Sequence, residues 1–288
     1  MLWRVADDGD VLRDIDETVD KPSAARVYDY FLGGSHHYAI DHAFAEKVTA
    51  RFPLLPQSAV ASRQFLGRAV RYCARAGITQ FVDIGSGLPA PGNLHEVADQ
   101  ARPKRDTHVV YVDNEPLAVL HSEILLADGA DEKRHRAIAG DFLWPPDLWR
   151  RVLETRIIDP FRPIALVVNA VLHFIKNEQN PGIALDFYRR KLVPGSMLVL
   201  SQFSQEGLSD DDDDWREVQD LVRYYESTTN PGQLRTAAEF TRFFGDWDLV
   251  EPGLVYAPAW RPAKDTVLAD QPSKSRVIAG VACKGGQP

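Results

Sequence analysis

The stretch from Thr79 to Asn93, TQFVDIGSGLPAPGN, constrains the fold of this chain more than any other part of its 288 residues. Its apolar start predicts a buried strand over Phe81–Ile84. The small residues Gly85–Gly87 permit a sharp turn, and Pro89 and Pro91 then exclude further strand and suit the approach to a helix. With no side chains in the way, the turn backbone can approach a ligand closely while helix-end N–H groups face it. The stretch therefore predicts a nucleotide-binding loop.

A second stretch, Thr107–Pro116 (THVVYVDNEP), predicts another buried strand, which ends in Asp113. The spacing from Gly87 to Asp113 leaves room for one helix and a return strand, which together make a βαβ unit. An acidic residue at the tip of this second strand is placed to accept hydrogen bonds from two ribose hydroxyls. The alternative is that Asp113 caps the helix that begins near Glu115–Pro116.

These stretches carry a resemblance to a known family. VDIGSGLP followed by VVYVDNEP resembles motifs I and II of the class I S-adenosylmethionine-dependent methyltransferases. Three longer stretches are similar to a family of actinobacterial S-adenosyl methyltransferases, formerly a domain of unknown function: DKPSAARVYDYFLGG (Asp20–Gly34), RQFLGRAVRYCARAGITQFVDIGSGLP (Arg63–Pro89) and AVLHFI (Ala170–Ile175). The similarity runs from about Ile15 to the C-terminus. It implies S-adenosylmethionine as the cofactor but no particular acceptor, because the substrates of that family are largely unassigned.

The motifs and the resemblance together give the expected cofactor contacts, which are Arg26, Tyr30, Asp83, Gly85, Ser86, Gly87, Asp113, Asn114, Asp141, Phe142 and Asn169. By the family pattern, the glycine turn with Asp83 would surround the methionyl group and Asp113 the ribose. Asp141 would meet the adenine amino group, with Phe142 against the ring. Asp141 also has a plain structural interpretation, as the cap of a turn or helix before Trp144–Pro145.

A continuous apolar run, Ile164–Val168, predicts a strand that is buried on both faces. Its end lies beside the first strand where the strand order reverses, which is where open α/β sheets bind ligands. Asn169 is therefore expected to face the methionyl end of the cofactor. His173 is the candidate general base, because a histidine ordinarily titrates near neutral pH. The alternative is that His173 is a structural residue.

Three helices are predicted ahead of the nucleotide loop, over about 22–32, 41–51 and 58–76. The first is rich in aromatic residues, carries Arg26 and Tyr30, and closes at Gly33–Gly34. We expect it to cover the cofactor as a lid, with Arg26 on the cofactor's carboxylate and Tyr30 as a second contact. The alternative is an amphipathic helix whose aromatics are core and whose arginine pairs with a surface acid.

Further strands are predicted at about 135–139, 196–201, 247–250 and 276–282, with an extension of the third of these to Tyr256 left open. The last two suit the antiparallel C-terminal pair that distinguishes methyltransferases from dehydrogenases. The expected fold is α/β, a Rossmann-like, doubly wound sheet of seven strands with an N-terminal helical extension. We expect a polar arm over residues 1–20, a helical cover over 21–77 and the methyltransferase domain over 78–288.

The composition of the chain limits which binding partners and which cellular compartment are expected for the protein. A net charge of −8 argues against a surface for nucleic-acid phosphates. No apolar run reaches the length of a membrane span, and the acidic N-terminus is unlike a signal peptide, so we expect a cytoplasmic protein. Cys73 and Cys283 show no metal or disulfide spacing. The run Asp210–Asp214 is better explained as a solvated loop than as a cation site, so no metal is expected.

The predicted function is transfer of a methyl group from S-adenosylmethionine to an unidentified small-molecule acceptor. A non-catalytic regulatory protein that binds the cofactor or its demethylated product is an alternative, because every strong motif concerns binding. A nicotinamide-dependent oxidoreductase is a further alternative, since Gly85-x-Gly87-x-x-Ala90 satisfies the relaxed dinucleotide fingerprint. Pro89, where close helix packing is wanted, argues against it. The sequence does not specify an oligomeric state.

Overall fold

The computed structural model describes residues 20–90, 92–102, 104–129, 133–209 and 213–286. All of the predicted polar arm except Asp20 lies outside these residues. Pro91 and three of the five consecutive aspartates, Asp210–Asp212, also lie outside them.

The described strands are β1 (Gln80–Ile84), β2 (His108–Asp113), β3 (His135–Ala139), β4 (Ile164–Val168), β5 (Met197–Phe203), β6 (Asp248–Leu249), β7 (Val255–Tyr256) and β8 (Val277–Cys283). They form one sheet in the order β3-β2-β1-β4-β5-β8-β6, and β7 also pairs with β8. Strands β1 to β5 are parallel, whereas β8 is antiparallel to each of its neighbours. The predicted α/β, doubly wound sheet with its antiparallel C-terminal strands is confirmed.

The sheet has eight strands among the described residues, whereas we expected seven. The strand predicted at about 247–250 is β6, and the extension that we left open to Tyr256 is instead a separate strand, β7; the two pair with different parts of β8. Between them, the N–H of Gly253 donates to the carbonyl of Val250 at 2.8 Å, and Gly253 has a φ of +85°. Glycine adopts this conformation readily, so the chain can turn here and interrupt the ladder.

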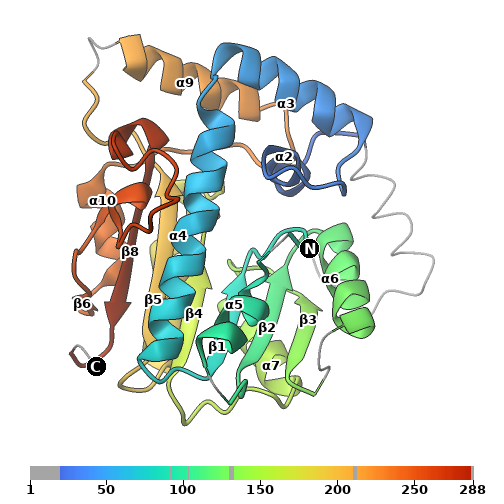
Figure 1. Cartoon of the computed structure of the whole chain (residues 1–288), viewed down its shortest axis with the longest axis vertical. Helices are drawn as coiled ribbons and strands as arrows, with labels where there is room; N and C mark the ends of the chain where they lie inside the picture. The colour runs from blue at the N-terminus through green and yellow to red at the C-terminus, as the bar shows by residue number, and fades with distance from the viewer. Residues whose placement is uncertain (1–19, 91, 103, 130–132, 210–212, 287–288) are drawn as a thin grey trace.

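Helices cover both faces of the sheet (Figure 1). One face carries α4 (Leu55–Arg75), α5 (Leu94–Ala101) and α6 (Pro116–Gly129), and the other carries α7 (Pro145–Glu154), α8 (Pro181–Lys191) and α10 (Ala237–Thr241). Phe81 of β1 packs with residues of α4 and α5, whereas the next residue, Val82, packs with residues of α7 and α8. Burial on both faces explains why the strands read as continuous apolar runs.

Short 3-10 helices complete the described structure: η1 (Leu172–Phe174), η2 (Asn177–Gln179), η3 (Arg242–Phe244), η4 (Ala257–Ala259) and η5 (Pro272–Ser275). Thr236 and Glu239 form a capping box at the start of α10, which η3 follows directly.

The three predicted N-terminal helices are confirmed as α2 (Ala24–Phe31), α3 (Ala39–Arg51) and α4. Helix α4 begins three residues earlier than predicted, because Pro56 lies in its first turn, where its missing N–H has no partner to lose. Helix α4 packs along the sheet, whereas α2 and α3 share a small separate core with Leu221 of α9 (Asp213–Tyr225). Figure 1 shows α2, α3 and α9 gathered at one end of the sheet, and we call these three helices the roof.

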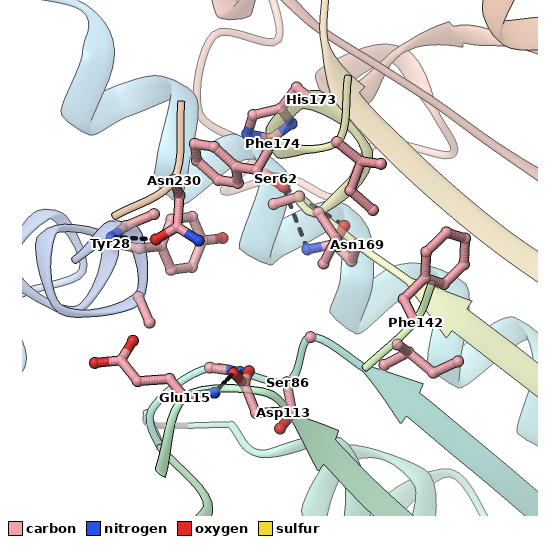
Figure 2. Close-up of a pocket in the computed structure, with 18 of the residues that line it drawn as sticks. Tyr28, Ser62, Ser86, Asp113, Glu115, Phe142, Asn169, His173, Phe174 and Asn230 are labelled. Atoms are coloured by element: carbon pink, nitrogen blue, oxygen red, sulfur yellow. Dashed lines mark hydrogen bonds between the residues drawn. The ribbon is translucent and has the colours of Figure 1, made fainter. Parts of the chain in front are cut away.

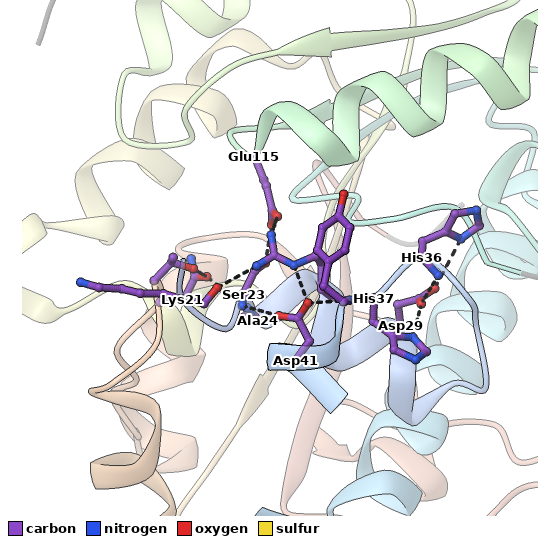
Figure 3. Close-up of polar contacts among 12 residues, drawn as sticks. Lys21, Ser23, Ala24, Asp29, His36, His37, Asp41 and Glu115 are labelled. Atoms are coloured by element: carbon purple, nitrogen blue, oxygen red, sulfur yellow. Dashed lines mark hydrogen bonds and ion pairs between the residues drawn. The ribbon is translucent and has the colours of Figure 1, made fainter. Parts of the chain in front are cut away.

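Arg26 on α2 fastens the roof to the sheet (Figure 3). Its side chain is 1% exposed, and it donates from Nε to Oδ2 of Asp41 on α3 and from Nη1 to Oε1 of Glu115, both at 2.7 Å. Its Nη2 donates to the carbonyl of Lys21 at 2.8 Å, and the hydroxyl of Ser23 also bonds Glu115. Glu115 directly precedes α6. A guanidinium removed from water needs such partners, and two carboxylates supply them.

Replacing Arg26 with alanine should lower the free energy of unfolding by about 3–5 kcal/mol, because the fully buried Asp41 is left without its cation. Arg150→Ala is the matched control. Arg150 also pairs with two carboxylates, but it is 54% exposed, so its loss should cost about 1 kcal/mol or less. Urea unfolding of both variants measures the difference. Equal losses would show that the contacts of Arg26 do not hold the roof.

Candidate functional site

A cavity of about 390 Å³ lies between the carboxyl ends of the parallel strands and the roof. This volume is typical of small-molecule sites. Most of the predicted site residues line it, namely Asp83, Gly85, Ser86, Gly87, Asp113, Asn114, Asp141, Phe142, Asn169 and His173. Figure 2 shows Ser86, Asp113 and Glu115 on one side of the open space, with Tyr28, His173 and Asn230 opposite them. The fold therefore brings these distant segments to one site, and their contact with a cofactor stays a prediction.

The glycine turn after β1 forms part of the cavity wall. Gly85 and Gly87 have φ values of +72° and +66°, in the region that favours glycine. A Cβ atom on Gly85 would lie 2.2 Å from Cγ2 of Val171, whereas a Cβ on Gly87 would meet nothing within 4 Å. Packing within the protein thus requires glycine at position 85. Gly87 instead leaves open backbone beside the cavity.

Asp113 at the end of β2 braces this turn. Its Oδ2 accepts the N–H of Gly87 at 2.8 Å, and its Oδ1 accepts the N–H of Glu115 at 2.9 Å, just ahead of α6. The second bond is the helix-start role that we gave as an alternative. The side chain also lines the cavity, and each carboxylate oxygen has a further lone pair. The predicted ribose contact is therefore compatible with the bonds that Asp113 already makes.

Asp141 and Phe142 follow β3 and line the cavity. Oδ1 of Asp141 accepts the N–H of Leu143 at 2.8 Å, which fixes the turn ahead of α7. Phe142 is buried, and its carbonyl accepts a hydrogen bond from the hydroxyl of Tyr188 at 3.2 Å. The turn interpretation of Asp141 is thus observed, and the adenine contact of both residues stays a prediction.

Asn169 follows β4, where the strand order reverses. Its Oδ1 accepts the hydroxyl of Ser201 at 2.7 Å, and its Nδ2 donates to the hydroxyl of Ser62 at 3.3 Å. The Ser201 oxygen also accepts the N–H of Ala170 at 3.0 Å, and Ala170 has a φ of +58°. Residues with a Cβ adopt this conformation at a cost, so the surrounding bonds must hold it. The network ties α4, β4 and β5 together at the cavity wall.

Arg63 of α4 lines the cavity and is a residue that we did not predict. Its Nη2 donates to the carbonyls of Ala90 at 3.3 Å and Gly92 at 3.1 Å, beyond the glycine turn. Burial raises the pKa of Asp83 to about 7; the charge of Arg63 opposes this rise and that of Asp113 adds to it. The sequence did offer one signal for Arg63 as a site residue: it is the first residue of Arg63–Pro89, one of the stretches that carry the family resemblance.

His173 lies in η1 and lines the cavity. The backbone N–H of Phe203 donates to Nδ1 at 3.2 Å, so the proton of the neutral ring lies on Nε2. Burial, together with the charge of Arg235, lowers the pKa of His173 to about 3. A ring with its Nδ1 lone pair engaged and a proton on Nε2 is a hydrogen-bond donor. This geometry does not support the predicted general base.

Arg26 and Tyr30 are not among the described residues that line the cavity. Arg26 is held by Asp41 and Glu115, and the ring of Tyr30 packs against those of His37 and His42, with centroids 5.2 and 4.8 Å away. The α2 residues that do line it are Ala24, Ala25, Tyr28 and Phe31. Helical periodicity places residues 24, 28 and 31 on one face and turns residues 26 and 30 away from it. The helix borders the cavity as expected, but with other side chains.

Within the described ranges, no helix is long and apolar enough to cross a membrane. The same residues contain no group of three or more His, Cys, Asp or Glu side chains that could hold a metal ion. Cys73 and Cys283 are both free and buried.

The strand order and the antiparallel β8 define a Rossmann-like sheet of the class I methyltransferase type. An O-methyltransferase family protein from Burkholderia thailandensis shares this fold at 12% identity and a TM-score of 0.50, with 97% of this chain and 70% of that one covered. Residues 10–285 match the model of the S-adenosyl methyltransferase family. The chain therefore belongs to that family.

Two solved structures are much more similar. A predicted methyltransferase from Thermobifida fusca YX is 36% identical, with a TM-score of 0.81, and the match covers 92% of this chain and 96% of that one. A DUF574 family protein from Streptomyces avermitilis MA-4680 is 33% identical, with a TM-score of 0.83 and coverage of 92% and 98%. No curated protein sequence gives a significant match. The resemblance inferred from the motifs is confirmed, and no acceptor comes with it.

Gly85→Ala should destabilise the protein more than Gly87→Ala. Both changes place a side chain at positive φ, which costs about 1–2 kcal/mol. Only the first also forces a methyl group against Val171, which adds about 1–3 kcal/mol of overpacking. Thermal unfolding of the ligand-free variants measures both costs. Combining Gly85→Ala with Val171→Ala should recover the overpacking part, and strict additivity of the two changes would refute the steric explanation.

Asp83 should make the ligand-free protein less stable as pH rises. An unfolded aspartate titrates near 3.8 and Asp83 in the folded protein near 7, so between these values the folded state binds more protons. The free energy of unfolding must then fall with rising pH across that window. Asp83→Asn should remove this dependence, whereas Asp270→Asn, at an exposed position, should leave it unchanged. Urea unfolding at about pH 5 and about pH 8 tests the expectation, and an unchanged profile in Asp83→Asn would contradict it.

Proposed function

We propose that the protein transfers a methyl group from S-adenosylmethionine to a small-molecule acceptor in the cavity beneath the roof. The observation that carries the proposal is the meeting of three loops in one cavity. The glycine turn after β1, Asp113 after β2 and Asp141 after β3 all line it. They do so in a chain that belongs to an S-adenosyl methyltransferase family. Ligands of open α/β sheets bind at this edge.

The cavity residues fit the cofactor group by group. The open backbone at Gly87, with Ser86 and Asp83, suits the methionyl group. Asp113 and Asn114 suit the ribose hydroxyls, and Asp141 with Phe142 suits the adenine.

Arg63 replaces Arg26 as our candidate partner of the methionyl carboxylate. It is the one arginine or lysine among the described cavity residues. Its guanidinium already lies beside the glycine turn, where it bonds carbonyls of residues 90 and 92. A guanidinium binds carboxylates through strong, charge-assisted hydrogen bonds.

When bound, S-adenosylmethionine supplies a methyl group on positively charged sulfur; an acceptor lone pair forms the new bond to carbon, and the electrons of the broken C–S bond stay on sulfur. The protein's part is to hold the two reactants in line and to keep water out of the site. The roof excludes water through three side chains that line the cavity, Tyr28 and Phe31 of α2 and Tyr225 of α9. An acceptor that carries O–H or N–H also loses a proton, which leaves for the bulk solvent with the product, since Nδ1 of His173 already accepts the N–H of Phe203.

Neither alternative gains support from the comparisons. A nicotinamide-dependent oxidoreductase is not among the matches reported above, which are methyltransferases and a DUF574 protein. A protein that binds the cofactor without turnover would use the same contacts. Incubation with methyl-labelled cofactor and an acceptor panel that includes extract of the native host distinguishes it, since only an enzyme transfers the label. Absence of transfer in a protein that binds the cofactor would favour the regulatory alternative.

S-adenosylmethionine and S-adenosylhomocysteine should stabilise the protein, and NAD should not. A ligand of the native state contributes about 2.7 kcal/mol to the free energy of unfolding at a hundredfold excess over its dissociation constant.

Arg63→Gln should weaken cofactor binding by about 1.5–3 kcal/mol through loss of a charged hydrogen bond. Arg75→Gln, at the exposed end of the same helix, is the control and should bind normally. Calorimetric titration gives the affinities, and stabilisation by NAD instead would sink the proposal.

A further inference from the structure

The side of the cavity that faces away from the predicted cofactor loops is aromatic. Figure 2 places Tyr28, His173, Phe174 and Asn230 across the open space from Ser86 and Asp113. The ring of Phe174 lies 5.7 Å from that of Tyr225 on α9, and Phe203 bonds His173 through its backbone. We call this the aromatic side; its apolar lining is Tyr28, Phe31, Leu55, Phe174, Phe203 and Tyr225. Its members come from α2, α4, η1, β5 and α9, so the roof and the sheet build it together.

The charged side chains of the cavity are not members of the aromatic side, although the charges of Arg63 and Asp83 reach Tyr28. Among the described lining residues they are Arg63, Asp83, Asp113, Glu115 and Asp141, which belong to the predicted cofactor loops or lie next to them. Burial raises the pKa values of Tyr28 and Tyr225, and burial with the Arg235 charge lowers that of His173 to about 3. All three are therefore neutral near pH 7, and the aromatic side offers no charge to a ligand.

Two polar groups on this side are held as hydrogen-bond donors. Arg235 is buried and donates to the carbonyls of Leu172 at 2.7 Å and Ile175 at 2.6 Å, which fixes the η1 segment that carries His173. With Nδ1 of that ring engaged by Phe203, the proton on Nε2 is available. Asn230 accepts the N–H of Ala24 at 3.3 Å through Oδ1, so its amino group is the part left to donate. Figure 2 shows that amino group on the side of the Asn230 amide away from the bonded oxygen.

We propose that the methyl acceptor is an uncharged, flat aromatic small molecule that presents a hydrogen-bond acceptor to His173 and Asn230. The inference rests on the proposed function, which assigns the charged side of the cavity to the cofactor. Aromatic rings pack well against the aromatic side chains on this wall. An anionic acceptor would be desolvated with only the sulfur of the cofactor, and no side chain of the aromatic side, to meet its charge. A cationic acceptor would be brought close to the positive sulfur of the cofactor, and like charges repel most strongly where water is excluded.

Three matched probes test the proposal on the full chain saturated with S-adenosylhomocysteine. They are 2-naphthol, which is flat and uncharged, its anionic counterpart 2-naphthoate, and the saturated decahydro-2-naphthol, which is uncharged but not flat. Ligand-observed NMR titration at neutral pH gives the three dissociation constants. We expect 2-naphthol to bind at least about tenfold more tightly than either of the others, a difference of about 1.4 kcal/mol. Equal or tighter binding of 2-naphthoate or decahydro-2-naphthol would overturn the proposal.

A pair of variants locates the binding. Phe174→Ala should weaken 2-naphthol about tenfold, the usual scale for removing one aromatic contact of this kind, and leave the affinity for S-adenosylhomocysteine unchanged. Phe161→Ala, at a position that is 87% exposed, is the matched control and should change neither. An unaltered affinity of Phe174→Ala for 2-naphthol would place the probe elsewhere and refute the proposal. If S-adenosylhomocysteine binds and 2-naphthol does not, this inference alone fails; if S-adenosylhomocysteine does not bind, the proposed function fails with it.

Discussion

The guanidinium of Arg26 joins the roof of the cavity to its floor. One carboxylate partner, Asp41, lies on α3, and the other, Glu115, lies two residues after Asp113. A charge this deeply buried is tolerated only with its partners in place, so the three side chains set where α2 and α3 lie over the strand ends. Because Glu115 also lines the cavity, the same contacts connect the roof to the loop predicted to bind ribose. Enclosure of the site and alignment of that loop therefore depend on one ionic cluster.

The position of the cavity follows from the sheet. Strands β1 and β4 are neighbours, but the chain leaves β1 towards α5 on one face and reaches β5 from β4 through α8 on the other, so their carboxyl ends open a crevice. The bonds of Asn169 with Ser62 and Ser201 close one wall of that crevice. Asp113 closes another by accepting the N–H of Gly87. Each wall is thus held by a side chain at the carboxyl end of a strand, and in a parallel sheet these strand ends lie along the same edge.

The sequence was sufficient for those features that depend on local pattern. Apolar runs and the glycine turn are read over a few residues, and the five parallel strands, β8 and the turn were predicted correctly. Which arginine reaches the cavity is not a local property. Arg26 and Arg63 both lie on helices ahead of β1, but Asp41 and Glu115 bind Arg26, whereas the packing of α4 places Arg63 at the cavity. The separate strand β7, where we had left open an extension of β6, likewise depends on how a turn meets β8.

The chemical role of His173 is likewise not predictable from local sequence. A histidine beyond the end of β4 has the right position for a base, and its ordinary pKa favours that role. The structure engages its Nδ1 with the N–H of Phe203, a residue thirty positions along the chain that sequence reasoning had not paired with it. The proton of the neutral ring then lies on Nε2, so in the proposed site the ring would orient an acceptor without removing its proton. Under the proposed function such a role suffices, because a methyl donor that is activated by its positive sulfur leaves alignment and exclusion of water as the main contributions of the protein.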